Sequence, residues 1–492
     1  MPDSGYLNYS GTYLINAANN RVYYNPTIEY KAPPKADGVS SYPDITDITD
    51  APLDGFDTSL GRDNITRHAG TQRGYGNSFN FYHSVTTGSG QNQVTRYYFR
   101  FTVGPVSSSQ TVYYVAPPGQ TCGTLTNCDD ASHSGSPIAP PGVSAWKNIG
   151  NWFSYYRTRI LMAKSGLMTA FVDLSPNYRF GFGSLNNTNS SNLPTDHYTS
   201  AYTTISNVRP FGDGSSSTNK AQFWKWLETM DPSDGTPLRR ALYSAGQYYE
   251  TAQPWQSMPG DPNYVAGGTN TDELACRASY TILTTDGFWN GADPNVAAMK
   301  KATDSDGTTY VDASGATAKY SAVPPFIGGN AVNDGTTANK GTSLADIAAY
   351  YWKRDLRPAT ANLVPTNQND PAFWQHMTTF TFGIGFEPVE YKNGPVLPMD
   401  DIFAWARDGS GTGSAFAIPG FSWPTPSKDN VTNIADMAHA AVVGRGNFFS
   451  ATNPQELADG FAKAIAQISE RNVASPPSSS NASVAVLGAL SF

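Results

Sequence analysis

Segments with strand-like and helix-like hydrophobic patterns alternate along the chain after residue 147, and this alternation restricts the fold more than any other feature of the sequence. Strand patterns cover 178–185, 280–285 and 378–386. Apolar residues at helical spacing predict helices over five further segments, 151–171, 223–230, 237–250, 344–352 and 454–468. Such an alternation predicts a mostly parallel sheet that is covered by helices on both faces.

The part of the chain before this alternation has a different texture. Residues 1–146 are rich in aromatic and turn residues and predict a β insertion region, with strands over 95–103 and 111–115. Residues 147–472 then form the predicted α/β core of the 492-residue chain.

Three segments depart from the regular pattern of the core. Gly-, Asn- and Thr-rich stretches near 290–340 and 387–446 are too long for ordinary connections and predict insertions. The Ser-, Pro- and Ala-rich segment 473–492 predicts a linker.

The composition excludes some classes of function. Charged residues make up only 15% of the chain and aromatic residues 13%, a combination more typical of secreted surface proteins than of intracellular enzymes. The net charge of −8, without a dense Lys/Arg cluster, disfavours a nucleic-acid partner. No apolar run approaches the roughly 20 residues of a transmembrane helix, so we expect a protein that does not span a membrane.

The chain has three cysteines. Cys122 and Cys128 lie in the loop TCGTLTNC and could close a small disulfide ring, with two free thiols as the alternative. Cys276 then has no partner, so the cysteines indicate neither a disulfide-rich scaffold nor a zinc site.

The candidate functional residues are Thr236 and Asp286. Asp286 follows the strand 280–285, and ligands of open parallel sheets bind beyond the carboxyl ends of the strands. Thr236 precedes the helix that starts at Pro237 and is expected at the same edge. A hydroxyl and a carboxylate there could bind a hard divalent cation. Each residue also has a simpler explanation, because Thr236 suits a helix N-cap and Asp-Gly is a common turn pair.

Other polar groups indicate no further site. Asp304, Asp306 and Asp312 lack the remaining acids of an EF-hand loop and predict a polar surface turn. The histidines are scattered, and we expect His376 to be packed in the core. The sequence contains no G-x-S-x-G elbow, P-loop or dinucleotide fingerprint, so no catalytic residue is assigned.

Several segments resemble a known family. GTPLRRAL, which contains Thr236, and TILTTDGFWN, which contains Asp286, resemble the second and third metal-site motifs of von Willebrand A domains. More broadly, the chain resembles the N-terminal, von Willebrand A-like half of the PilY family, the tip-associated adhesins and assembly factors of type IV pili. The matching segments run in order over nearly the whole chain: RVYYNPTIEY (21–30), NWFSYYRTRILMAKSG (151–166), DGTPLRRALYSAGQYYE (234–250), CRASYTILTTDGFWN (276–290), SLADIAAYYWKRDLRP (343–358) and DPAFWQHMTTFTFGIGF (370–386).

The resemblance implies a von Willebrand A-type doubly wound, mostly parallel α/β fold with large β and loop insertions, and a MIDAS-like site for Mg²⁺ or Ca²⁺. The family's site also needs an Asp-x-Ser-x-Ser motif after a buried first strand, whereas the start of this chain offers only Asp3-Ser4-Gly5. We therefore expect a fragment that lacks the family's signal peptide, first strand, first metal motif and C-terminal β-propeller half. A missing central strand predicts a groove lined by unpaired backbone groups, and the incomplete site predicts weak or no metal binding.

The expected function is that of a non-enzymatic, type IV pilus-associated adhesion and assembly module. It would bind minor pilins at the pilus tip, or a host or abiotic surface, through the rim around Asp286. The expected location is secreted or at the cell surface of a Gram-negative bacterium, in the outer membrane or periplasm. The alternative is a secreted hydrolase with its active site built from the insertions, which requires a nucleophile, a base and an acid converging in one cleft.

Overall fold

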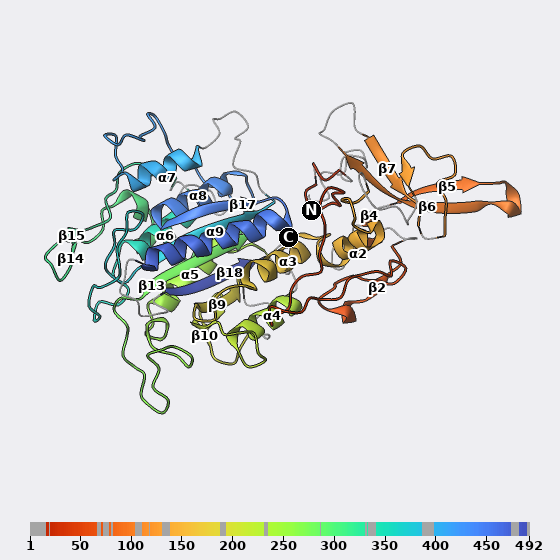
Figure 1. Ribbon diagram of the computed structural model, residues 1–492. Coiled ribbons are helices and arrows are strands. Elements are labelled where there is room, and N and C mark those ends of the chain that lie inside the picture. The colour runs from red at the N-terminus through yellow and green to blue at the C-terminus, as the bar shows by residue number, and fades with distance from the viewer. Residues whose placement is uncertain are drawn as a thin grey trace. The chain divides into compact units, whose positions relative to one another are not determined.

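The computed structural model in Figure 1 contains two compact units. One comprises Met1–Thr169 and Thr452–Gln455, and the other comprises Ala170–Ala451 and Glu456–Phe492. The structure describes residues 16–18, 20–65, 70–71, 78–79, 82–103, 111–117, 119–129, 138–186, 193–230, 235–285, 287–329, 332, 341–385, 398–473 and 482–489.

The first unit is built around a four-stranded sheet of order β5-β6-β7-β8. Its elements, with the helix that leads into the second unit, are β1 (Ala51–Pro52), β2 (Arg62–Asp63), β3 (Gly70–Thr71), β4 (Ser78–Phe79), β5 (Tyr82–Thr87), β6 (Val94–Val103), β7 (Thr111–Val115), β8 (Cys128–Asp129), α2 (Ala145–Tyr155) and α3 (Arg159–Phe171). β6 and β7 confirm the two predicted strands. The single helix predicted over 151–171 is instead two helices, because the chain leaves helical geometry at Tyr156.

Side chains of helix α2 form hydrogen bonds with the irregular segment that precedes the helix in the sequence. The Asn148 side chain accepts a hydrogen bond from the backbone N–H of Tyr30 (2.7 Å), and Asn151 accepts one from Ile45 (2.8 Å). These buried amides supply partners that a loop otherwise lacks. The helix therefore packs with the aromatic region, and the units divide at 169–170 rather than at the expected 146–147.

The second unit is built around a six-stranded sheet. Its elements are β9 (Arg179–Ser184), β10 (His197–Thr199), β11 (Thr204–Ser206), β12 (Arg209–Pro210), α4 (Asn219–Thr229), α5 (Leu238–Tyr249), β13 (Ala278–Thr285), β14 (Tyr310–Val311), β15 (Thr317–Ala318), α6 (Leu344–Trp352), β16 (Met377–Ile384), α7 (Met399–Arg407), α8 (Thr432–Val443), β17 (Arg445–Ala451), α9 (Pro454–Val473) and β18 (Ala482–Ala489). β9, β13 and β16 confirm the predicted strands of the core.

The strand order of this sheet is β12-β9-β18-β13-β16-β17. Neighbouring strands from β9 to β17 are parallel, and only the short edge strand β12 is antiparallel to its neighbour. Every residue of β13 is buried, as is usual for a strand of a parallel sheet that is covered on both faces.

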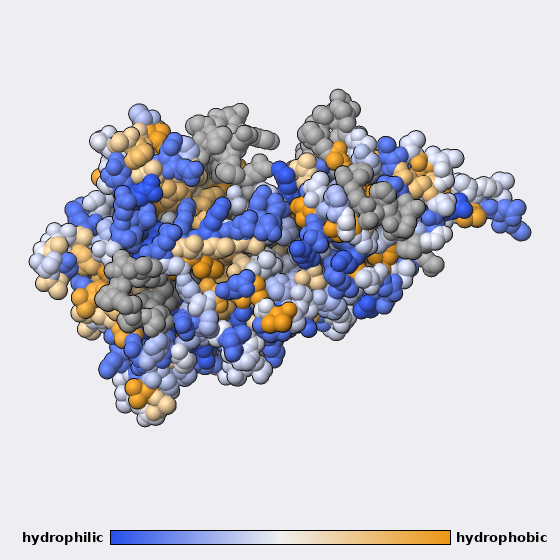
Figure 2. Space-filling model, viewed as in Figure 1, coloured by the Kyte–Doolittle hydropathy of each residue, from blue (hydrophilic) through white to orange (hydrophobic). Residues whose placement is uncertain are grey.

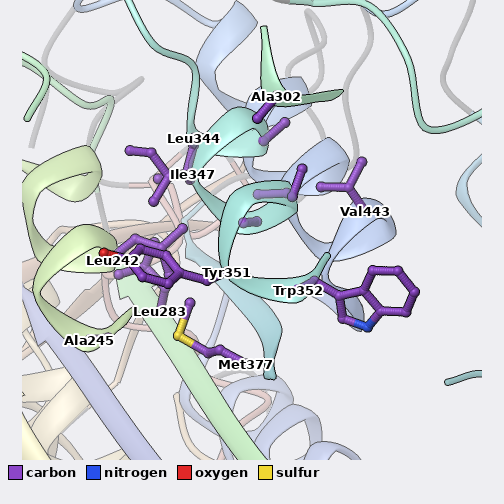
Figure 3. Close-up of a cluster of buried hydrophobic side chains, with 14 of the residues drawn as sticks. Leu242, Ala245, Leu283, Ala302, Leu344, Ile347, Tyr351, Trp352, Met377 and Val443 are labelled. Carbon is purple, nitrogen blue, oxygen red and sulfur yellow. The ribbon is translucent and has the colours of Figure 1, made fainter. Parts of the chain in front are cut away.

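One face of the sheet is covered by α5, α6 and α8. Leu283 of β13 and Met377 of β16 belong to the same buried cluster as Leu242, Leu344 and Val443 from these helices, and Figure 3 shows how closely they lie. The capping box of Ser343 with Asp346 satisfies the first backbone donors of α6.

The other face carries α4 and α9. Phe182 of β9 contacts Trp226 of α4, with ring centroids 5.2 Å apart, and Phe382 of β16 stacks on Phe461 of α9 at 4.2 Å. The unit is therefore an α/β/α arrangement of three layers. Hydrophilic and weakly polar residues predominate on its visible surface, and strongly hydrophobic ones occur singly or in small groups (Figure 2).

Two features of the sheet differ from the expectations. The segment 473–492, predicted as a linker, contains strand β18, which lies between β9 and β13. The predicted open groove is therefore filled, and its edges are paired on both sides. The stretch 387–446, predicted as an insertion, contains helix α8, whose Met437 carbonyl accepts a hydrogen bond from Thr381 of β16 (2.9 Å).

Candidate functional site

The carboxyl ends of the parallel strands β9, β18, β13 and β16 form one edge of the sheet, here called the rim. β13 ends at Thr285, and its successor Asp286 lies outside the described residues. The Thr285 hydroxyl lies 3.1 Å from both the N–H and the carbonyl of Gly287, so the chain turns immediately after the strand.

Thr236 lies beside the loop that follows β13. Its backbone N–H donates to the side-chain oxygen of Asn290 (2.8 Å), and the N–H of Asn290 donates to the carbonyl of Thr236 (3.0 Å). A Cβ on Gly235 would lie 2.3 Å from the Asn290 side-chain oxygen, so this contact needs a glycine. The structure thus brings the predicted Thr236 segment to the loop that contains position 286.

α5 begins at Leu238, with Pro237 as its N-cap. Asn290 is the residue that joins the two segments, and sequence reasoning missed it. The only signal for it was its position at the end of the TILTTDGFWN motif.

Trp289 anchors the loop after β13 in the core. Its side chain is buried, its ring packs against the Arg239 guanidinium at 4.1 Å, and its Nε1 donates to Asp436 (3.0 Å). Arg239 also donates to the carbonyls of Gly291 (2.7 Å) and Thr342 (3.1 Å). One buried arginine of α5 therefore connects this loop to the start of α6.

Asp436 of α8 is a third buried residue, with Trp289 and Arg239, that fixes the loop after β13. One carboxylate oxygen accepts from Trp289 and from the N–H of Leu344 (3.0 Å), and the other accepts from the N–H of Ala345 (3.1 Å). The carboxylate thus lies at the N-terminus of α6, where backbone donors lack helical partners. Burial raises the pKa of Asp436 to about 6, although its hydrogen bonds oppose the shift.

The accessible part of the rim carries aromatic and arginine side chains. The guanidinium of Arg240, in the first turn of α5, lies 4.7 Å from the ring centroid of Tyr202, and both residues are half-buried. The Tyr202 ring also contacts Tyr243 (6.0 Å). Ser200 donates to Ser244 (2.7 Å), which fixes the β10–β11 turn against α5.

A buried pair of an acid and a histidine, Asp370 and His376, lies at the end of the sheet opposite the rim. His376 Nε2 is 3.1 Å from Asp370, its Nδ1 is 2.7 Å from the Trp374 carbonyl, and Thr378 donates to Asp370 (2.8 Å). Burial lowers the pKa of His376, but the Asp370 carboxylate raises it by more, so the net shift is upward. His376 is 4% exposed and is packed in the core, as predicted.

The acidic residues of the 304–312 stretch bind their own loops. Asp304 and Asp306 accept hydrogen bonds from the N–H groups of Gly328 (3.0 Å) and Ala322 (2.8 Å), whereas Asp312 closes its own turn through Ser314 (2.8 Å). They form polar turns rather than a calcium loop. Across the described part of the chain, no three acidic, histidine or cysteine side chains converge to hold a metal ion.

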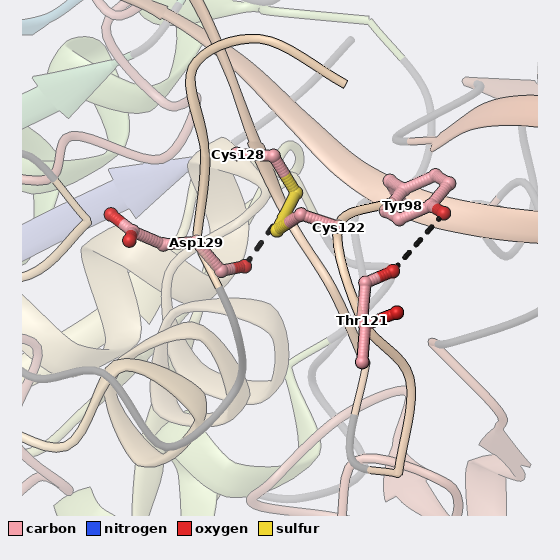
Figure 4. The surroundings of a disulfide bond; sticks show 5 residues. All are labelled: Tyr98, Thr121, Cys122, Cys128 and Asp129. Atoms are coloured by element: carbon pink, nitrogen blue, oxygen red, sulfur yellow. Dashed lines mark hydrogen bonds between the residues drawn. A yellow bond between two sulfur atoms is a disulfide. The ribbon is translucent and has the colours of Figure 1, made fainter. Parts of the chain in front are cut away.

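The cysteines are placed in two different environments. Cys122 and Cys128 are joined by a disulfide that ties their loop to β8, beside the hydrogen bond from Tyr98 to the Thr121 carbonyl (3.3 Å; Figure 4). Cys276 is a half-buried free thiol. None of the described helices has both the length and the apolar character needed to cross a membrane.

A hard cation prefers several oxygen ligands. Of the two candidates, the described residues include Thr236 alone.

Comparison with known proteins finds similar sequences among type IV pilus biogenesis factors. It is 29% identical over 498 residues to the type IV pilus biogenesis factor PilY1 of Pseudomonas aeruginosa strain PAO1. It is 30% and 28% identical to the proteins of the same name from strains UCBPP-PA14 and PAK. Each similarity covers 96% of this chain and 37% of the relative.

No family model and no solved structure matches the chain. The chain thus spans 37% of the length of these curated relatives, and the similarity extends over nearly all of it. The chain thus has relatives among the PilY1 proteins.

Proposed function

We propose that the chain is a non-enzymatic adhesion and assembly module of type IV pili, built on a von Willebrand A-type domain. It binds minor pilins, or a host or abiotic surface, through the rim, and acts outside a Gram-negative cell or on its surface. The name of its relatives, type IV pilus biogenesis factor, supports the pilus role.

The strand order supports the proposed domain type. Doubly wound sheets have the order 3-2-1-4-5-6, and ligands bind at the point where the order reverses. β12-β9-β18-β13-β16-β17 has this form, with β18 in the place of strand 1. The reversal lies between β18 and β13, next to the Thr236–Asn290 contact.

The observation that carries the proposal is the junction of the Thr236 turn with the loop after β13. Asn290 and Thr236 form two hydrogen bonds that join the two segments. Arg239 and Asp436 fix the loop through hydrogen bonds with Gly291 and Trp289. Arg240 and Tyr202 lie on the accessible side, and Arg and Tyr are enriched among residues that dominate protein-binding energy. A rim that is fixed by these hydrogen bonds and carries such side chains is suited to binding another protein.

The hydrolase alternative receives less support. It needs a nucleophile, a base and an acid in one accessible cleft. Among the described histidines, His376 has an acid and a hydroxyl beside it, but both of its nitrogens are engaged and its side chain is buried. That pair lies at the amino end of β16, away from the rim.

For the cation, we propose that Mg²⁺ or Ca²⁺ belongs to the full-length family and binds this chain weakly or not at all. Thr236 and Asp286 would supply two oxygen ligands, and we assign no further residue of this chain to the family's site. Isothermal titration of the chain with MgCl₂ and with CaCl₂ should show no micromolar binding. A micromolar dissociation constant that is lost in Asp286→Asn would contradict the proposal.

The partner proposal is tested by binding of the purified chain to immobilised minor pilins. Arg240→Ala removes the cation–π pair of the rim and should weaken binding about tenfold, or about 1.4 kcal/mol. Arg407→Ala is the matched control, because Arg407 lines a pocket with Arg445 and Arg471 at the amino end of β17. Equal loss in both variants, or no binding by the parent chain, would refute the proposal.

A further inference from the structure

The centre of the six-stranded sheet is occupied by the strand that comes last in the described chain. β18 pairs with β13 from Ala482 to Ala489 and with β9 from Ser483 to Gly488, in parallel orientation on both sides. In the sheet order β9 and β13 are not neighbours, so β18 joins the two parts of the sheet.

The chain builds the two parts of the sheet before β18. β12 follows β9 on its outer side, whereas β13, β16 and β17 follow one another toward the opposite edge. Each part also has helices of its own, because Phe182 packs against α4 and Leu283 lies in the cluster formed with α5, α6 and α8. Until segment 482–489 enters, β9 and β13 therefore border a slot with two open strand edges.

The two strands that border this slot, β9 and β13, determine which kind of segment can occupy it. All residues of β9 and β13 are buried. An unpaired backbone group at such depth costs about 1–3 kcal/mol, so the occupant must be an extended strand that pairs with both edges. It must also be free of charge. The segment 482–489, ASVAVLGA, meets these requirements.

One short segment connects α9 to β18. Eight residues, 474–481, link the end of α9 to the start of β18, and this link contains Pro476, Pro477 and several serines. Recognition through backbone ladders depends on an extended peptide rather than on its origin, as in donor-strand complementation. The slot therefore cannot distinguish its own segment from the same segment of another molecule.

We propose that the slot between β9 and β13 is a strand-acceptor site and that β18 is its exchangeable occupant. When the resident segment leaves, the slot takes up the 482–489 segment of a second copy of the chain, in the same parallel register. This site lies in the interior of the sheet, and the proposal is independent of the rim and its partners.

The test places one proline in the resident strand of the full chain. Val486 pairs with Ile282 of β13 and with Phe182 of β9, and Val486→Pro removes a ladder donor and weakens the resident strand. A labelled synthetic peptide of residues 481–490, NASVAVLGAL, should then bind the variant, as measured by fluorescence anisotropy. Binding should restore the protection of the β9 and β13 amides in hydrogen exchange.

The parent chain and a second peptide are the controls. The tethered strand of the parent chain has an effective concentration in the millimolar range, so the peptide should bind the parent at least about 100-fold more weakly than the variant. A peptide with proline at the Val486 position should bind neither chain. If Val486→Pro does not fold alone, refolding with the parent peptide should restore it. Equal binding to both chains, or failure of the peptide to bind or rescue the variant, would overturn the proposal.

Discussion

Asp436 is a buried carboxylate that accepts hydrogen bonds from three donors on two other segments, the loop after β13 and the start of α6. Burial raises its pKa to about 6, above the value of about 4 expected in an unfolded chain. The folded state therefore binds a proton more tightly than the unfolded state. This group contributes most to stability below about pH 4, and the contribution falls as the pH rises through 6.

Asp436→Asn should flatten that pH dependence. The folded and unfolded carboxyl differ in proton binding between about pH 4 and 6, where one group contributes a slope of up to about 1.4 kcal/mol per pH unit. The variant loses this slope, and at pH 5 it should be less stable by about 1–3 kcal/mol because its amide cannot accept from all three donors. Urea unfolding followed by tryptophan fluorescence over this range measures both effects.

Asp401→Asn on α7 is the matched control, since Asp401 is exposed. It should leave the slope of stability against pH unchanged. The same slope in the parent chain and in Asp436→Asn would show that the carboxyl does not titrate as its burial implies.

Local sequence patterns point to only some of the residues that meet beside the loop after β13. Thr236 was chosen because a hydroxyl precedes a helix at the expected edge, and the structure places it beside the loop after β13. Asn290 and Asp436 were not chosen, because their partners are 54 and 91–147 residues away in the chain. Contacts of such range have no local pattern that could reveal them.

Helices α5 and α6 approach each other closely at Gly246. A Cβ at this position would lie 2.2–2.3 Å from three atoms of the Tyr351 ring, which is buried. Helix propensity alone predicts that alanine stabilises a helix interior by about 1 kcal/mol relative to glycine. Here steric overlap with the ring outweighs this gain.

Gly246→Ala should therefore destabilise the α/β unit by about 1–3 kcal/mol, the usual range for an overpacked core. Thermal unfolding of the variant and of the exposed Gly413→Ala control measures the effect, since a Cβ at Gly413 meets no atom within 4 Å. Gly246→Ala combined with Tyr351→Leu should recover part of the loss. A Gly246→Ala variant as stable as the parent would contradict the close approach.

The elements that were predicted correctly have strong local patterns. β13 is rich in β-branched residues, and α9 begins at Pro454, as its N-cap sequence predicted. β18 was missed because Ala, Ser and Gly have low strand propensity and follow a Ser/Pro-rich segment. Its place in the sheet depends on the edges of β9 and β13, which no local pattern records.

The similarity to PilY1 runs through both compact units of the chain. It covers 96% of the chain, and the alternation that predicted the α/β core is only part of that length. Helix α2, whose sequence texture suggested the core, instead anchors the aromatic first unit through Asn148 and Asn151. The boundary between the two compact units depends on such long-range contacts. The change in sequence pattern at residue 147 therefore predicted the boundary at the wrong position.

The proposed function requires that minor pilins contact the rim. Phe288 lies in the loop after β13 and is half-buried, and Phe403 of α7 is half-buried beside the amino end of β17. Replacing each in turn by the photoreactive residue p-benzoylphenylalanine allows cross-linking to purified minor pilins. If minor pilins bind at the rim, position 288 should give a cross-linked product, identified by mass spectrometry, and position 403 should give none. No product from position 288, or equal yields from both positions, would contradict binding at the rim.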